Sequence, residues 1–278
     1  MSTWRSGSTF LGQLLQTHPG VFQHYEPLSY IGVKQVRSGK DAFLAQQVIH
    51  RLLDCQYEKL PDYMNYTKTH LLEMMGQNVP IWNACKNGPN KMVCADQTFL
   101  SESCQMFPIQ LVKTVRLRLN LTQLLLNDDK LRVKVLFLVR DPRGIMSSRY
   151  SSVDWCSKET ECGSPEVLCQ DMQGDLKVAS VFEKLYPERF MKLSYEELAG
   201  NTVEEVTKLL SFLGLEFTSS IKDYLNEHTS TNKDAPWSTA RKSSERITLW
   251  KKNLSKEQIQ EIQNACGKIL QDLKLELI

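Results

Sequence analysis

The segment Thr3-Trp4-Arg5-Ser6-Gly7-Ser8-Thr9-Phe10 places a glycine between small hydroxyl residues, directly before an amphipathic stretch. Leu11, Leu14 and Leu15 continue the apolar face at helical spacing, and His18-Pro19-Gly20 ends the predicted helix. A loop that opens a helix leaves several backbone N–H groups unpaired, at the end where the helix dipole is positive. Such an end binds phosphate or sulfate groups. The alternative is an ordinary turn in which Ser8 caps the helix.

The residue types of this loop also suit an anion. Gly7 allows the backbone to approach the anion closely, Ser8 and Thr9 carry hydroxyl donors, and Arg5 carries a planar fork of charged donors. The ATP-type P-loop requires Gly-Lys-Ser/Thr, whereas Ser8 follows Gly7 here and the loop has no lysine. The sequence therefore predicts a phosphate loop of another kind.

The bulk properties limit the classes of function. A chain of 278 residues is long enough for one domain with a substantial core. Its formal net charge of +2 does not favour a nucleic-acid binder, so the anion site must be local. No run of about 18 apolar residues is present, and no signal peptide is recognisable. Because Met1 stands so close to the loop, we expect the strand before it to be largely missing, in a shortened form that has lost an N-terminal anchor.

The cysteines and glycosylation sequons point to a compartment. Eight cysteines are many for a reducing environment, and no Cys-x-x-Cys pair supports a zinc site or a redox motif. Sequons begin at Asn65, Asn120 and Asn253. Together these features favour a secretory lumen, and we expect no metal.

Alternating strands and helices indicate an α/β fold with a parallel sheet. The strongest predicted strand, 133–139, is almost continuously apolar, as a central strand covered on both faces is. It leads into Arg140-Asp141-Pro142-Arg143, and Pro142 suits the first turn of a helix that carries Ser148. The other predicted strands are 21–24, 109–115 and 189–193; the other helices are 41–53, 121–126, a helix ending near 186, 202–213 and 255–273.

Two further local signals can be checked directly. Thr202 with Glu205, and Ser255 with Gln258, have the spacing of capping boxes at helix starts. Residues 54–100 mix aromatic, polar and cysteine residues, so we expect a loop-rich insertion over one end of the sheet that serves acceptor recognition.

Several polar residues follow predicted strand ends. Pro27 ends the strand 21–24 and leaves Glu26 at its carboxyl edge, where open α/β sheets bind ligands. Arg5 and the pair Arg140 and Ser148 form two basic clusters at the same edge. They suggest a ligand with phosphate-like groups at both ends, such as a nucleotide with a 3′-phosphate and a 5′-anhydride. The simpler alternative is a local salt bridge between Arg140 and Asp141.

Three motifs carry a family resemblance: Arg5–Phe10, His24-Tyr25-Glu26-Pro27-Leu28, and Leu138–Arg143 with Ser147-Ser148-Arg149. In this order they resemble the Golgi carbohydrate sulfotransferases, and more narrowly the galactose/N-acetylglucosamine/N-acetylgalactosamine 6-O-sulfotransferase group. Weaker similarity continues through Tyr195 and the stretch from Arg241 to Cys266. The resemblance implies one P-loop-like sulfotransferase domain over 1–278, located in the Golgi lumen.

The resemblance also implies a donor, an acceptor and site residues. The donor would be 3′-phosphoadenosine 5′-phosphosulfate (PAPS), and the acceptor the 6-hydroxyl of galactose or an N-acetylhexosamine in a keratan- or chondroitin-type, N- or O-glycan. Arg140 and Ser148 would hold the 3′-phosphate. Tyr195, Arg241 and Trp250 would form walls of the nucleotide site. The 5′-phosphosulfate would lie in the loop Arg5, Ser6, Gly7, Ser8, Thr9 and Phe10.

Transfer to a hydroxyl needs a general base. We expect Glu26 in this role, since related tyrosylprotein sulfotransferases place a glutamate at a similar distance from their Arg-Ser-Gly motif. His24 competes with it, because an even spacing along a strand lets both side chains share a face. Arg5, with Lys113 from the neighbouring strand, would stabilise the transferring group; the alternative for Lys113 is a solvated lysine.

Three rival functions follow from the same residues. They are a nucleotide kinase with a degenerate P-loop, a catalytically impaired protein that only binds glycan or nucleotide, and a sulfotransferase that acts on protein tyrosine.

Overall fold

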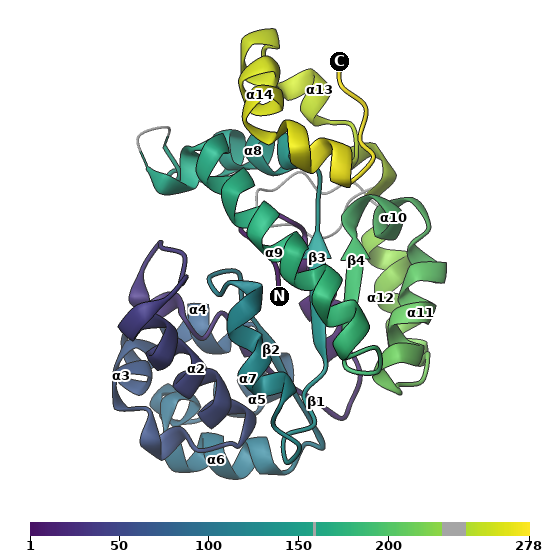
Figure 1. Ribbon diagram of the computed structural model, residues 1–278. Helices are drawn as coiled ribbons and strands as arrows, with labels where there is room; N and C mark the ends of the chain where they lie inside the picture. The colour runs from purple at the N-terminus through teal and green to yellow at the C-terminus, as the bar shows by residue number, and fades with distance from the viewer. Residues whose placement is uncertain (158–159, 230–242) are drawn as a thin grey trace.

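The computed structural model describes residues 1–157, 160–229 and 243–278. Two small parallel sheets lie among many helices, which confirms the α/β class (Figure 1). In one sheet β1 (Val21–Tyr25) pairs with β2 (Ile109–Lys113), and Tyr25 lies opposite Lys113. In the other, β3 (Val135–Val139) pairs with β4 (Phe190–Ser194). The short strands agree with the predicted strands to within two residues at each end.

The sheet is divided where the sequence analysis expects one parallel sheet, because β2 and β3 do not pair with each other. Met1 and Ser2 together bond to both sides of the division. The Met1 amino group donates to Leu136 O at 2.7 Å, and Leu138 N donates to Met1 O at 2.9 Å. Ser2 N donates to Thr114 O at 3.3 Å. The two sheets are therefore joined through the first two residues of the chain.

The helices form two groups around these sheets. In Figure 1 the group α2 to α7 surrounds β1 and β2, while α9 to α12 flank β3 and β4, with α8, α13 and α14 beyond their upper ends. α1 (Ser8–Gln16) contacts β1, β2 and also α12 of the second group. The helices of the first group are α2 (Gly39–Leu53), α3 (Pro61–Thr69), α4 (Leu71–Met75), α5 (Val79–Cys85), α6 (Gln97–Gln105) and α7 (Gln123–Leu126). Those of the second are α8 (Pro142–Ser152), α9 (Pro165–Leu185), α10 (Tyr195–Gly200), α11 (Thr202–Leu213), α12 (Ser219–Thr229), α13 (Trp250–Asn253) and α14 (Lys256–Asp272).

Two local expectations were wrong. Residues 54–100 are not loop-rich: α3, α4, α5 and the start of α6 occupy much of this stretch. These helices are too short for a clear 3.6-residue period, which explains why the pattern did not reveal them. Thr202 does not cap α11, because the helix already includes Thr202 and Asn201 occupies the cap position. Ser255 and Gln258 do form the predicted capping box of α14.

All eight cysteines are paired in disulfides. Cys55–Cys104 and Cys85–Cys94 tie together the short helices of the insertion. Cys169–Cys266 joins α9 to α14, and Cys156–Cys162 closes a small loop after α8. This oxidised state agrees with a secretory compartment. In the part of the chain that the structure describes, none of the helices has the length and apolar character needed to cross a bilayer.

Candidate active site

A cavity of about 720 Å³ opens at the carboxyl ends of all four strands. Each strand supplies a lining residue at or just beyond its last position: Glu26 after β1, Lys113 in β2, Arg140 after β3 and Tyr195 after β4. This is the edge at which parallel α/β sheets bind ligands. The cavity therefore gathers residues that are far apart in the sequence.

The loop before α1 forms one wall of this cavity. Gly7 is the N-cap of α1 with φ of 95°, in the left-handed region, and no side chain caps the helix. A Cβ atom at Gly7 would lie 2.7 Å from the Tyr195 ring. Only glycine therefore fits here without strain. The positive end of α1 faces the cavity, where the loop residues Arg5, Gly7, Ser8, Thr9 and Phe10 line it.

Ser6 differs from the other loop residues because it does not line the cavity. Its side chain is buried, and its hydroxyl donates to the carbonyl of Thr3. Arg149 of α8 also contacts this loop, since its guanidinium donates to Thr3 Oγ1 at 2.8 Å. The same guanidinium donates to Cys162 O at 2.7 Å. Burial lowers the pKa of Arg149 to about 9. Ser6 and Arg149 thus maintain the shape of the loop.

Arg5, Arg140 and Ser148 form a single basic wall rather than two separate clusters. Arg5 Nε donates to Ser148 Oγ at 2.9 Å, and Arg140 Nη1 donates to Arg5 O at 2.8 Å. The Arg140 guanidinium lies 4.2 Å from the centre of the Tyr195 ring. Asp141 pairs with Arg143 at 2.9 Å, so the expected alternative of an Arg140–Asp141 bridge is wrong. Among the described residues Arg140 forms no ion pair, and its charge faces the cavity.

Glu26 also lines the cavity and is held by two cations. Lys113 Nζ contacts Oε1, and Arg116 Nη1 lies 2.9 Å from Oε2. Val115 N also approaches Oε2, at 3.4 Å. Glu26 is 6% exposed and has φ of 42°. The carboxylate is thus nearly buried, fully ion-paired and directed at the cavity that the loop also lines.

His24 does not share a face with Glu26. Its ring is buried, with Nδ1 at 2.9 Å from Tyr57 Oη and Nε2 at 3.3 Å from Gln110 Oε1. It does not line the cavity. The expectation of a shared face was wrong because β1 ends at Tyr25 and the positive φ of Glu26 breaks the alternation. Burial lowers the pKa of His24 to about 4.

Three further residues were predicted for the site: Trp250, Arg241 and Lys113. Trp250 is buried at the margin of the cavity, with the Arg143 guanidinium 4.1 Å from its ring centre. Arg241 lies outside the described residues. Lys113, for which a solvated lysine was the alternative, is 8% exposed and bound to Glu26.

Sequence reasoning missed Arg116, which contacts Glu26. Arg116 Nε also donates to Gly32 O at 2.8 Å. The available signal was its position three residues beyond β2, at the same edge as the other site residues. Sequence reasoning also missed Tyr66, Glu73 and Gln77, which line the cavity from α3, α4 and the turn after α4.

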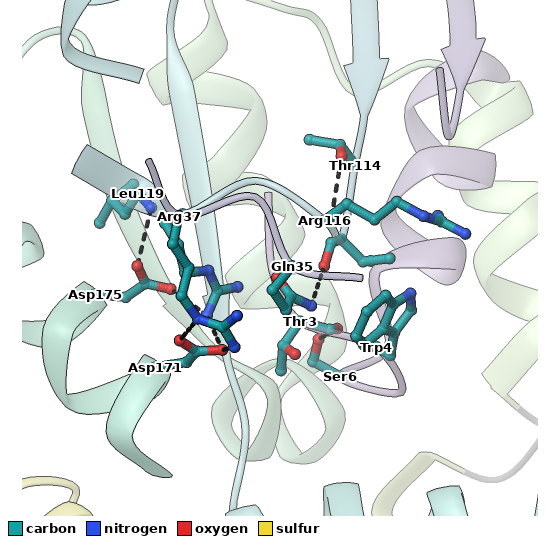
Figure 2. Close-up of polar contacts among 12 residues, drawn as sticks. Thr3, Trp4, Ser6, Gln35, Arg37, Thr114, Arg116, Leu119, Asp171 and Asp175 are labelled. Carbon is teal, nitrogen blue, oxygen red and sulfur yellow. Dashed lines mark hydrogen bonds and ion pairs between the residues drawn. The ribbon is translucent and has the colours of Figure 1, made fainter. Parts of the chain in front are cut away.

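A network of polar contacts fixes the segment that carries Arg116 (Figure 2). Arg37 forms two hydrogen bonds of 2.8 Å to Asp171 of α9, and Leu119 N donates to Asp175 at 2.9 Å. Gln35 lies beside the loop that contains Thr3 in Figure 2, and its amide donates to Val115 O at 3.0 Å. Burial raises the pKa of Asp175 to about 6. The chain after β2 is thereby tied to α9 and lies against the loop that precedes α1.

Comparisons with known proteins identify relatives of this chain. The family profile described as a sulfotransferase domain matches residues 1–274. The chain is 26% identical over 319 residues to carbohydrate sulfotransferase 1 of Danio rerio, covering 98% of this chain and 76% of that protein. It is 24% identical over 307 residues to carbohydrate sulfotransferase 4 of Mus musculus, covering 97% and 79%. The sulfotransferase domain of the Synechococcus PCC 7002 olefin synthase shares the fold, with a TM-score of 0.54 and 14% identity over 100% of this chain and 94% of that one.

Proposed function

Because the chain belongs to the sulfotransferase domain family, we propose that it transfers the sulfuryl group of PAPS to a sugar hydroxyl. One observation carries the proposal: the uncapped end of α1, the cation of Arg140 and the carboxylate of Glu26 all line one cavity. The reaction requires hydrogen-bond donors and positive charge to bind the anionic PAPS, which the α1 end and Arg140 can supply. It also requires a base for the acceptor hydroxyl, and a carboxylate such as Glu26 can serve as one.

The basic wall is the proposed donor site. The N–H groups at the start of α1, with the Ser8 and Thr9 hydroxyls, bind the 5′-phosphosulfate, as helix amino ends bind anions. Arg140 and Ser148 bind the 3′-phosphate. The contacts between Arg5, Arg140 and Ser148 support this assignment, since they hold the residues for the 5′-phosphosulfate and those for the 3′-phosphate in one wall. Tyr195 and Trp250 flank the nucleoside, and Arg241 is proposed for the same site.

Glu26 is the proposed general base. A carboxylate has about four lone-pair positions, and Lys113, Arg116 and Val115 N occupy three of them. The remaining position can accept the proton of the acceptor hydroxyl as its oxygen attacks sulfur. The bond from sulfur to the bridging oxygen then breaks, and the electron pair passes to the departing 5′-phosphate. Arg5 and Lys113 stabilise that negative charge.

The acceptor is proposed to be a glycan, with the 6-hydroxyl of galactose or an N-acetylhexosamine as the reacting group. Two matched relatives are named carbohydrate sulfotransferases, and Tyr66, Glu73 and Gln77 line the same cavity as Glu26. An aromatic ring beside planar hydrogen-bonding groups suits a sugar, which has both apolar faces and hydroxyls. The four disulfides support the Golgi lumen as the site of action.

The decisive experiment compares Glu26→Gln with Glu73→Gln in sulfate transfer from labelled PAPS to keratan- and chondroitin-type acceptors. We expect Glu26→Gln to reduce kcat by about 10²–10⁴-fold, the usual contribution of a general base. Binding of the desulfated nucleotide should remain. Glu73→Gln removes a carboxylate from the same cavity, and it should change the KM for the glycan without this loss of kcat.

Several outcomes would overturn parts of the proposal. Unchanged kcat in Glu26→Gln would reject its role as base. Nucleotide binding without transfer to any acceptor would favour the binding-only alternative. Transfer to a tyrosine peptide alone would change the acceptor class, and magnesium-dependent ATP turnover would favour the kinase.

A further inference from the structure

Trp155 is an aromatic residue of the active-site cavity that none of the proposed donor or base contacts involves. It lies shortly beyond the end of α8 and lines the same cavity as Glu26. It is only half-buried. Because covering a large apolar ring is favourable, an indole that borders a polar cavity offers a surface that a ligand can cover.

The buried side of Trp155 is held by packing. Its ring lies edge-on against Trp4, with the ring centres 5.8 Å apart and an angle of 66° between the planes. Both rings belong to a small apolar cluster that also contains Val153 and the Cys156–Cys162 disulfide. The disulfide begins at the residue next to Trp155, so it restrains the backbone on that side. A ring restrained in this way loses little freedom when a ligand covers it.

Trp4 connects Trp155 to the proposed base. The Arg116 guanidinium lies 5.8 Å from the centre of the Trp4 ring, and Arg116 Nη1 lies 2.9 Å from Glu26 Oε2. Trp4, Arg116, Glu26 and Trp155 all line the cavity. A short oligosaccharide that presents a hydroxyl to Glu26 can therefore place another of its sugars against the Trp155 ring.

The indole also has the chemistry to select the kind of sugar that it contacts. The face of an aromatic ring is electron-rich, so it attracts the C–H groups on the face of a pyranose ring and disfavours an anionic group. The indole N–H can donate to a sugar hydroxyl. A platform of this kind suits an uncharged sugar better than a uronate or a sulfated sugar.

We propose that Trp155 is the acceptor platform of the active site, where its ring stacks on an uncharged pyranose ring of the glycan near the sugar that reacts at Glu26. The inference rests on the proposed function, since it needs a glycan acceptor. It assigns the acceptor class more narrowly: chains of uncharged hexoses, as in keratan-type glycans, fit better than chondroitin-type chains, in which every second sugar is a uronate.

The first test measures sulfate transfer from saturating PAPS to an uncharged N-acetyllactosamine oligosaccharide. Trp155→Ala should raise the KM for the glycan by at least about tenfold, as expected when a packed tryptophan contact is lost. An unchanged kcat would show that the lost contact is made equally in the ground state and the transition state. Trp155→Phe keeps an aromatic face and should recover most of the loss. On a chondroitin oligosaccharide, Trp155→Ala should raise the KM less.

Two further measurements separate binding from folding. Trp82→Ala is the matched control, because Trp82 of α5 is also half-buried but does not line the cavity, and it should leave the KM for the glycan unchanged. Fluorine NMR of the whole protein labelled with 5-fluorotryptophan reports on the unsubstituted ring directly. The Trp155 signal, assigned with Trp155→Phe, should move when the oligosaccharide is added in the presence of desulfated nucleotide, and the Trp82 signal should not.

The outcomes distinguish this inference from the proposed function. Glycan transfer by the parent, with the same KM in Trp155→Ala and an unmoved Trp155 signal, would overturn the platform and leave the proposed function intact. Weaker binding of desulfated nucleotide in Trp155→Ala, with an unchanged KM for the glycan, would assign the ring to the nucleoside and also reject the platform. Absence of transfer to any glycan by the parent would overturn the proposed function, and the platform with it.

Discussion

At the scale of single residues, the candidate site depends on how each charge is partnered. Glu26 is enclosed by Lys113, Arg116 and a backbone N–H, so its position is determined by three contacts. Arg140 is supported by the carbonyl of Arg5 and the ring of Tyr195, neither of which neutralises it. The contacts of Glu26 hold its carboxylate in one position, whereas those of Arg140 leave its charge available to bind an anion.

We predict that Arg140→Ala weakens binding of the desulfated nucleotide by about 1.5–3 kcal/mol, the range for hydrogen bonds to charged groups. Isothermal titration calorimetry measures this loss. Lys184→Ala is the matched control, because Lys184 is an exposed cation at the end of α9 outside the cavity. An unchanged dissociation constant in Arg140→Ala would show that the 3′-phosphate binds elsewhere.

His24 makes the stability of the fold depend on pH. The unfolded chain gains a proton below pH 6.5, whereas buried His24 stays neutral until about pH 4. The free energy of unfolding should therefore fall as the pH decreases over this range, by about 3 kcal/mol from His24.

Urea unfolding of the parent and of His24→Gln between pH 7 and pH 4 tests this prediction. The variant should lose less stability toward low pH. The difference between the two proteins isolates the contribution of His24 to this pH dependence. The contribution of Asp175 is present in both, and its raised pKa favours folding as the pH falls toward 4. Identical pH dependence in both proteins would contradict the prediction.

At the scale of elements, the loop of residues 3–7 joins the first residues of the chain to the start of α1. Gly7 begins α1 in the left-handed region and packs against Tyr195, the first residue after β4. The loop is thus shaped by contacts from the other sheet as well as by its own sequence. This dependence explains how a loop near the start of the chain is positioned by residues from α8 and α10.

We predict opposite effects of the same substitution in two elements. Gly7→Ala should destabilise the protein by at least about 1–2 kcal/mol, because alanine disfavours the left-handed region and its Cβ meets Tyr195. Gly174→Ala, within α9 and with no atom near its added Cβ, should stabilise it by about 0.5–1 kcal/mol. Thermal unfolding measures both. Equal shifts of Tm would refute the role of Gly7.

At the scale of the whole molecule, disulfides connect segments that are distant in the sequence. Cys169 and Cys266 are 97 residues apart and join α9 to α14, whereas Cys85 and Cys94 are 9 residues apart. Loop-closure entropy grows with the length of the closed loop, so the Cys169–Cys266 bond restricts the unfolded chain more strongly than the Cys85–Cys94 bond does.

We therefore predict that replacing both Cys169 and Cys266 by alanine lowers the free energy of unfolding by about 2 kcal/mol more than replacing Cys85 and Cys94. Urea denaturation of the two double variants checks the difference. Retained sulfate transfer at low temperature in both would show that the loss concerns stability rather than the site. A larger loss in the Cys85 and Cys94 variant would contradict the prediction.

Local sequence was sufficient for the strands, for the helices α2, α9, α11 and α14, and for the residues at strand ends, but not for α12. Strand 133–139 was recognisable from its apolar run, and α14 from Ser255 and Gln258, because these signals act within a few residues. The short helices of 54–100 were not recognisable, since their stability comes from disulfides and packing. Arg116 was missed for the same reason: its role depends on Glu26, 90 positions earlier.

The order of residues alone was enough to predict the glycine-containing loop before α1, the α/β class and the residues that end each strand, because backbone propensity and hydrophobic period are local properties. Tertiary structure alone decided three other matters. It separated His24 from Glu26, merged Arg5, Arg140 and Ser148 into one wall, and left β2 and β3 unpaired. Each of these depends on contacts between distant segments, whose geometry is set by packing of the whole chain.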